Sequence, residues 1–195
     1  GSGLVGSEMC IRDRTVQGLT DKEVNYMRNS VKATVDAYDG SVDLYTWDDS
    51  DPVLKAWQSI FPGQYHPMSE ISGDLMAHMR YPEGMFKVQR QLLAKYHVTS
   101  ASQFFSGEDF WQTPVDPTES KSEQSRDVLQ PPYYLTLQTG GSDEPVFSLT
   151  STYIPAGSST REILTGFLSV DSDAGRTKGV RGPDYGTIRL QELPK

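Results

Sequence analysis

The apolar residues of this 195-residue chain change their spacing near residue 130, and this change limits the folds that the chain can adopt. In the middle of the chain, from about residue 51 to residue 105, apolar residues recur every three or four positions, the spacing of one face of an α-helix. After residue 130, four segments have the two-residue period of half-buried β-strands: 133–139, 146–154, 163–171 and 187–193. Turn-forming residues separate these segments. We therefore expect an antiparallel β-meander in the C-terminal part.

A β-hairpin is predicted in the N-terminal part. The segments 31–38 and 42–47 contain many β-prone residues, and they flank Asp39-Gly40. An Asp-Gly pair favours a tight turn, because glycine adopts a left-handed backbone conformation without strain.

Helices are predicted in the middle of the chain. Asp51-Pro52 suits the start of a helix, and Pro62-Gly63 suits its end. A longer helical block is expected at 72–97, interrupted at Tyr81-Pro82, and a shorter helix at 101–105. The predicted fold class is α+β, with an N-terminal β-hairpin, a helical middle and a C-terminal antiparallel β-meander.

One further helix is predicted before the hairpin. Thr20 and Glu23 have the spacing of a capping box, in which each side chain satisfies a backbone N–H group at the start of a helix. This pattern favours a short helix from Asp21 to about Ser30.

The predicted domain organisation has a leader and one domain. Residues 1–14 show neither helical nor strand periodicity, and SEMCIRDR within them resembles a translated cloning or sequencing adapter. We expect either an artefactual or an ordinary disordered leader there, followed by a single domain at 15–195. The polar segment 114–130, rich in Ser, Glu, Asp and Pro, predicts a mobile surface loop.

Composition argues against some classes of partner. The formal net charge of -8 repels phosphate backbones, so we expect no nucleic acid partner. No apolar stretch approaches the ~20 residues that span a bilayer, and none resembles a signal peptide. Cys10, the single cysteine, can form neither an internal disulfide nor a cysteine-based zinc site. These observations predict that the chain, taken on its own, is a soluble domain without a transmembrane segment.

Two acidic motifs could bind a cation. Asp48, Asp49 and Asp51 could hold calcium, but carboxylates are also favoured at the start of a helix, and we prefer this capping interpretation. The segment 171–175 (Asp-Ser-Asp-Ala-Gly) resembles the opening of a calcium loop. The twelfth position of that loop, which needs a carboxylate, is Gly182. A turn is therefore the better interpretation of this segment.

The histidines do not predict a metal site either. Asp74 and His78 have the spacing of one helical turn and could share a metal, but a surface His–Asp pair is favoured. His66 and His97 do not stand at metal-ligand spacing from His78. We expect no metal, no cofactor and no assigned catalytic residue, and the binding residues are unknown.

The aromatic residues could form a platform for a sugar or a peptide, but core packing is favoured for most of them. Trp47 and Trp111 are predicted to be the exposed exceptions. The aromatic set considered is Tyr45, Trp47, Trp57, Tyr81, Phe104, Phe105, Phe110, Trp111, Tyr133 and Tyr134.

Four segments resemble signature stretches of uncharacterised protein family 0182: Asn25–Gly40, Val53–Pro62, Met79–Gln89 and Gly107–Trp111. The resemblance runs from about Asn25 to the C-terminus. It departs at Gly84-Met85, where Asp-Leu is expected.

This resemblance implies that the chain is an internal fragment of a large bacterial integral membrane protein, on the extracytoplasmic side. Its partners would be the remainder of that protein and an envelope component. The family implies no activity, so two hypotheses stay open. The favoured one is a non-enzymatic structural or binding module at the cell envelope. The alternative is an envelope hydrolase that uses paired carboxylates.

Overall fold

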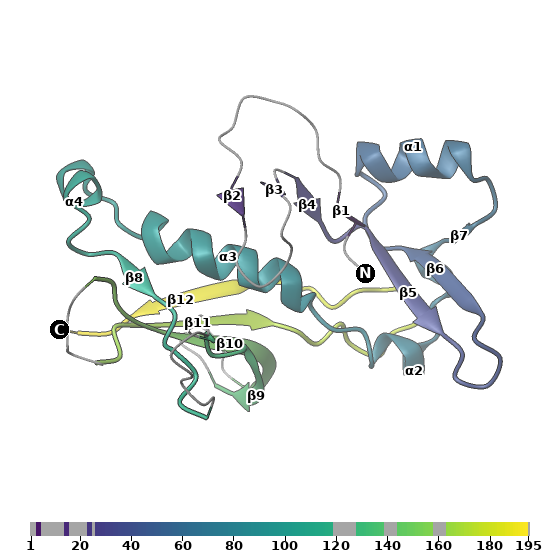
Figure 1. Ribbon diagram of the computed structural model, residues 1–195. Helices are drawn as coiled ribbons and strands as arrows, with labels where there is room; N and C mark the ends of the chain where they lie inside the picture. Colours follow the sequence, from purple (N-terminus) through teal and green to yellow (C-terminus); the bar gives the residue numbers. More distant parts are fainter. Residues whose placement is uncertain are drawn as a thin grey trace. The chain divides into compact units, whose positions relative to one another are not determined.

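A computed structural model describes residues 3–4, 14–15, 23–24, 26–118, 128–138, 144–157 and 163–194 (Figure 1). The chain divides into two compact units. Unit 1 comprises Gly1–Met85 and Asp173–Pro183, and unit 2 comprises Phe86–Ser172 and Asp184–Lys195. Helices and strands are both present, and the sheet of the C-terminal part is antiparallel, which confirms the α+β class.

The predicted N-terminal hairpin is confirmed. Strands β5 (Val31–Val35) and β6 (Val42–Thr46) pair antiparallel, and the short strand β7 (Tyr65–His66) adds to β6 in parallel. The turn closes through a 2.9 Å hydrogen bond from the Gly40 N–H to the Asp36 carbonyl. Gly40 has φ of +76°, the left-handed conformation that glycine adopts without strain.

The helices between residues 52 and 96 follow local sequence signals. Helix α1 (Pro52–Ile60) begins after Asp51, and the 3₁₀ helix η1 (Met68–Glu70) and helix α2 (Gly73–Met76) come next. Helix α3 (Glu83–Tyr96) begins after Tyr81-Pro82, so the predicted interruption of the 72–97 block is confirmed. A proline disfavours helical backbone in the residue before it, which explains the break.

The segment 173–183 also belongs to unit 1, although its sequence neighbours lie in unit 2. The Gly179 N–H donates a 3.0 Å hydrogen bond to the Ile71 carbonyl. A Cβ on Gly73 would lie 2.5 Å from the Arg176 carbonyl oxygen. Glycine is therefore needed at position 73 because two backbone segments approach closely there.

The predicted helix from Asp21 to about Ser30 is wrong. Strands β3 (Glu23–Val24) and β4 (Met27–Arg28) occupy its described residues. They pair with β2 (Arg14–Thr15) and β1 (Gly3–Leu4), respectively. A helix of about ten residues is marginal by itself, so strand pairing overrides a capping signal. Thr20 lies outside the described residues, and so do most residues of 1–14, where an artefactual or disordered leader stays a prediction.

The predicted meander of unit 2 is confirmed. It consists of β9 (Tyr133–Leu137), β10 (Val146–Pro155), β11 (Gly166–Asp171) and β12 (Ile188–Glu192), each antiparallel to its neighbour. The two-residue strand β8 (Trp111–Gln112) pairs with the end of β10. Helix α4 (Ala101–Ser106) confirms the short helix predicted there.

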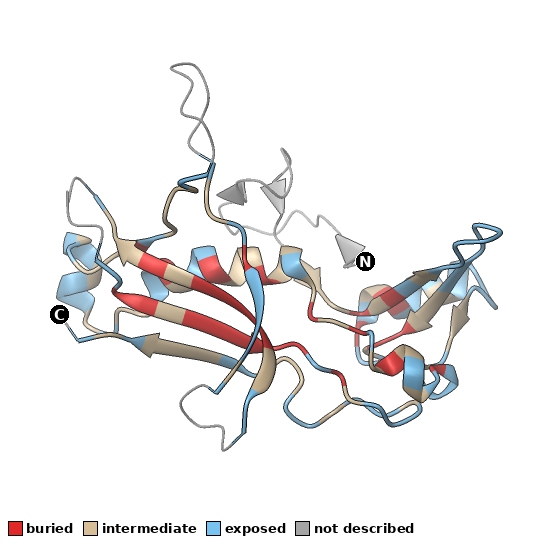
Figure 2. Ribbon diagram, turned by 90° about the horizontal axis from the view of Figure 1, so that it is seen from below, coloured by how far each residue is buried: buried red, intermediate tan, exposed pale blue. Residues whose placement is uncertain are grey.

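Within unit 2, α3 runs along the sheet (Figure 1). Phe86, Arg90 and Ala94 are buried, and their four-residue spacing puts them on one face of the helix. The Tyr153 hydroxyl of β10 donates a 2.8 Å hydrogen bond to the Arg90 carbonyl. Figure 2 shows that the buried residues concentrate on β10 and β11, among them Leu168. The helix and the two central strands thus form the core of this unit.

The prediction that Trp47 and Trp111 are exposed is wrong, since their exposed fractions are 1% and 5%. The Trp111 ring lies 5.3 Å from the Tyr153 ring, and a Cβ on Gly166 would come within 2.6 Å of the Trp111 ring. The backbone N–H of Trp47 donates a 2.8 Å hydrogen bond to the Ser30 carbonyl, which holds the residue inside unit 1. Position in the tertiary fold, which residue type does not reveal, decides which aromatic residues are covered.

The ends of the predicted loop 114–130 pair with each other. Val115 and Leu129 form an isolated antiparallel bridge, and the Asp116 N–H donates a 2.8 Å hydrogen bond to the Val128 carbonyl. Residues 119–127, the middle of the predicted mobile loop, lie outside the described residues.

Among the described residues, every helix is too short or too polar to cross a membrane.

Replacing Gly40 with valine should destabilise the chain by about 1 kcal/mol or more. No atom lies within 4 Å of a Cβ built at this position, so the cost comes from forcing a β-branched residue to positive φ. Chemical denaturation of both proteins measures the change. Gly40→Asn is the matched control, because asparagine tolerates this conformation, and it should lose less stability. Equal losses for both variants would contradict the backbone explanation.

Candidate functional site

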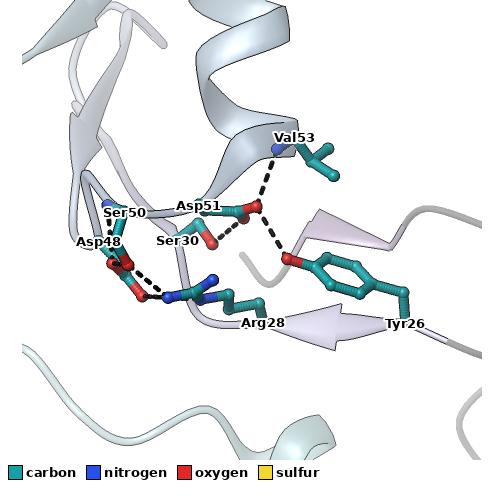
Figure 3. Close-up of polar contacts among 7 residues, drawn as sticks. All are labelled: Tyr26, Arg28, Ser30, Asp48, Ser50, Asp51 and Val53. Carbon is teal, nitrogen blue, oxygen red and sulfur yellow. Dashed lines mark hydrogen bonds and ion pairs between the residues drawn. The ribbon is translucent and has the colours of Figure 1, made fainter.

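A cluster of polar residues in unit 1 surrounds the start of α1 (Figure 3). Asp51 is the N-cap residue of the helix, and its Oδ1 accepts a 2.9 Å hydrogen bond from the Val53 N–H. The same oxygen accepts a 2.8 Å hydrogen bond from the Tyr26 hydroxyl. Its Oδ2 accepts a short hydrogen bond from the Ser30 hydroxyl. One buried carboxylate thus connects α1 with residues 26 and 30.

A second carboxylate of the predicted acidic motif is also engaged. Asp48 forms an ion pair with Arg28, whose Nη2 lies 2.7 Å from Oδ2. The Ser50 N–H and hydroxyl donate hydrogen bonds of 3.0 and 2.6 Å to Asp48 Oδ1. Asp49, the third member of the motif, is exposed. The three carboxylates therefore do not converge on one point as calcium ligands would.

The electrostatics of this cluster favour ionised carboxylates. Burial opposes ionisation of Asp51, but hydrogen bonds from Ser30, Tyr26 and Val53 outweigh it and lower the pKa of Asp51. Asp48 behaves likewise, because hydrogen bonds from Ser50 and Arg28 lower its pKa despite partial burial. The hydrogen bond to Asp51 raises the pKa of Tyr26. The cluster is therefore suited to fixing backbone segments and not to supplying a proton at neutral pH.

The histidines singled out in the sequence are not brought together by the described contacts. His78 Nδ1 lies 2.7 Å from the Asp74 carbonyl, so its described partner is backbone and not the Asp74 carboxylate. His66 Nδ1 lies 2.9 Å from Glu70 Oε2. His97 belongs to unit 2, where its ring stacks on Trp111. In the parts of the chain that the structure describes, no group of three or more His, Cys, Asp or Glu residues could hold a metal.

The motif at 171–175 divides into two parts with different roles. Asp171 ends β11, is 1% exposed and forms an ion pair with Arg189 of β12. Asp173 starts a turn, in which its Oδ1 accepts a 2.9 Å hydrogen bond from the Gly175 N–H. The turn interpretation thus describes Asp173, whereas Asp171 holds two neighbouring strands together.

A cationic cluster around Trp47 was not predicted. The Lys32 Nζ lies 5.1 Å from the centre of the Trp47 ring, and the Arg181 guanidinium lies 5.7 Å from it. Lys32 is 7% exposed, and its Nζ donates a 2.7 Å hydrogen bond to the Arg80 carbonyl. Burial, together with the positive charge of Arg181, lowers the pKa of Lys32 to about 8. Lys32 is buried whereas the next residue, Ala33, is exposed, so the side of β5 that carries Lys32 faces the interior of unit 1.

Replacing Asp51 with alanine should destabilise the chain by about 2 kcal/mol or more, since it removes an N-cap and leaves two hydroxyl donors without their acceptor. Asp49→Ala is the matched control and should change stability by less than about 0.5 kcal/mol. Because the pKa of Asp51 is lowered in the folded state, its stabilisation is present at neutral pH and lost as the solution is acidified. Urea denaturation between neutral and acidic pH measures both effects. A similar loss in the two variants at neutral pH would contradict the capping role.

Lys32 should make the folded state more stable as pH rises from about 7.5 to 9.5. Its pKa of about 8 in the folded state lies below the ordinary lysine value of 10.5, so the unfolded chain binds more protons in this range. Stability then increases with pH, by about 1–2 kcal/mol over this interval. Denaturation curves at several pH values measure the change, and Lys32→Met should lack this increase. An equal increase in the variant would assign the pH dependence to another group.

Comparison with known proteins identifies relatives along nearly the whole chain. The model of the uncharacterised protein family UPF0182 matches residues 7–195. A UPF0182 protein of Bifidobacterium adolescentis is 82% identical over 181 residues, which cover 93% of this chain and 17% of the relative. A UPF0182 protein of Bifidobacterium longum is 77% identical over 185 residues, covering 95% of this chain and 17% of the relative. One from Kineococcus radiotolerans is 57% identical over 184 residues, covering 93% of this chain and 18% of the relative.

No solved structure matches this chain. The chain spans 17% of the length of each of the two Bifidobacterium relatives, so it corresponds to a small part of much longer polypeptides. The family match covers nearly all of its residues and agrees with the resemblance of its signature stretches. This chain belongs to the uncharacterised protein family UPF0182.

Proposed function

We propose that this chain is a non-enzymatic module of a larger bacterial membrane protein, with a structural or binding role on the extracytoplasmic side of the cell envelope. The family resemblance supports a membrane-embedded parent, and the length of the relatives supports a parent that is much longer than this chain. The proposal of a non-enzymatic role is supported by the polar cluster at the start of α1, whose carboxylates hold backbone segments in place.

In that cluster, Asp51 and Asp48 are held by donors from the protein itself. A hydrolase with paired carboxylates needs one carboxyl group that is protonated near neutral pH and one that is ionised. The pKa values of Asp51 and Asp48 are both lowered, so this pair favours two ionised carboxylates. Structural use of these groups is therefore the better account of the cluster.

Sidedness can be tested in cells that produce the full-length protein. Tyr38, at the tip of the β5–β6 hairpin, is fully exposed, and Tyr38→Cys places a reactive thiol there in a background whose other cysteines are replaced. A membrane-impermeant maleimide should label this thiol in intact cells. Labelling only after the cells are lysed would contradict an extracytoplasmic location.

The matched control for this experiment is Ser169→Cys, because Ser169 is 0% exposed and cysteine is close to serine in size. This thiol should stay unlabelled in intact and lysed cells and react only after denaturation. Its labelling pattern shows whether the segment remains folded during the measurement.

A further inference from the structure

Helix α1 buries only part of its apolar stripe. Leu54 is 3% exposed, so one side of the helix packs into unit 1. Trp57, Ile60 and Phe61, which continue the stripe over the next two turns, have exposed fractions of 45%, 62% and 47%. We call these three residues the α1 apolar patch. Burial of large apolar side chains is favourable, so a partner that covers the patch would gain this stabilisation.

The patch contains an exposed tryptophan, unlike the rest of the chain. The chain has three tryptophans, and Trp47 and Trp111 are both buried. Trp57 instead stacks on Phe61 one helical turn later, with ring centres 5.7 Å apart and planes within 12°. The two rings support each other in a flat arrangement, so a partner would meet a pre-ordered aromatic surface at a low entropic cost.

Charge indicates what kind of partner this patch suits. Lys55 is the only charged residue of α1, whereas the whole chain has a formal net charge of -8. The patch is thus an uncharged surface on an acidic chain, which fits an apolar partner. A second copy of the chain would bring two charges of -8 together, and this repulsion disfavours self-association.

The length of the relatives indicates where such a partner lies. Residues matching this chain make up 17% of the Bifidobacterium adolescentis relative, so most of that polypeptide lies outside the match. A surface elsewhere in the same polypeptide is tethered to the patch, at an effective concentration of about a millimolar. It can therefore dock even when its intrinsic affinity for the patch is weak.

We propose that the α1 apolar patch is the docking site for an apolar surface in the remainder of the full-length polypeptide. This inference rests on the proposed function in one respect, namely that the chain is a module of a longer protein. It does not depend on the side of the membrane on which the module lies.

The test compares thiol reactivity at the patch in two proteins, the 195-residue chain and the detergent-solubilised full-length polypeptide. Ile60→Cys is introduced into each, in a background without other cysteines. Ile60 is 62% exposed, so the substitution should leave the fold intact, and Phe61→Cys provides a second position. We expect both thiols to react with a maleimide at least about tenfold more slowly in the full-length polypeptide, because docking covers them.

Tyr38→Cys is the matched control for this comparison, because Tyr38 lies on the same unit away from α1 in sequence and is fully exposed. It should react at the same rate in both proteins. Equal rates at Ile60 in the two proteins would overturn the proposal, and so would equal slowing at Ile60 and Tyr38.

Two other outcomes distinguish other occupants. Reactivity in the 195-residue chain that falls as its concentration rises would assign the patch to a second copy and overturn the proposal. Protection that appears only when the full-length polypeptide is returned to a lipid bilayer would assign the patch to lipid, with the same consequence. Reactivity in detergent does not depend on the side of the membrane on which the module lies. A negative result here therefore contradicts docking of the patch without bearing on the extracytoplasmic location, which the labelling of intact cells tests.

Discussion

Unit 1 depends on the buried carboxylate of Asp51. A buried charge is costly unless hydrogen bonds satisfy it, and Asp51 obtains them from Tyr26, Ser30 and the Val53 N–H. These donors come from the segment before β5 and from the first turn of α1, so ionisation of one side chain fixes both segments relative to each other. The neighbouring Arg28–Asp48 ion pair joins the segment before β5 to the turn that precedes α1. The start of α1 is therefore a junction as well as a cap.

Unit 2 is held together by different means. The face of α3 that carries Phe86 packs along the central strands, and Tyr153 anchors the helix backbone through its hydroxyl. Between β11 and β12, the buried Asp171 forms an ion pair with the partly exposed Arg189. Desolvation of Asp171 offsets much of the attraction in such a pair, so its net contribution to stability is limited.

The polar groups near α1 have structural roles. The carboxylates with described partners near α1 hold backbone segments, and the histidines of the chain are spread over both units. The stacked pair of Trp57 and Phe61, together with Ile60, is an apolar surface that internal packing does not explain. A module of a long polypeptide has a reason to keep such a surface, since its partner can be another part of the same molecule.

The sequence by itself determined the elements whose causes are local. Asp39-Gly40 specifies a turn, Asp51-Pro52 starts a helix, and two-residue periodicity marks the strands from β9 to β12, because each signal acts through neighbouring residues. Tertiary structure decided the rest. The capping pattern after Thr20 gave way to strand pairing, and segment 173–183 joined unit 1 through close backbone approaches that no local signal encodes. Whether Trp47 or Trp57 is covered likewise depends on which distant groups reach each ring, as Lys32 and Arg181 reach the ring of Trp47. Burial is a property of contacts between remote segments, and spacing along the chain carries no direct record of them.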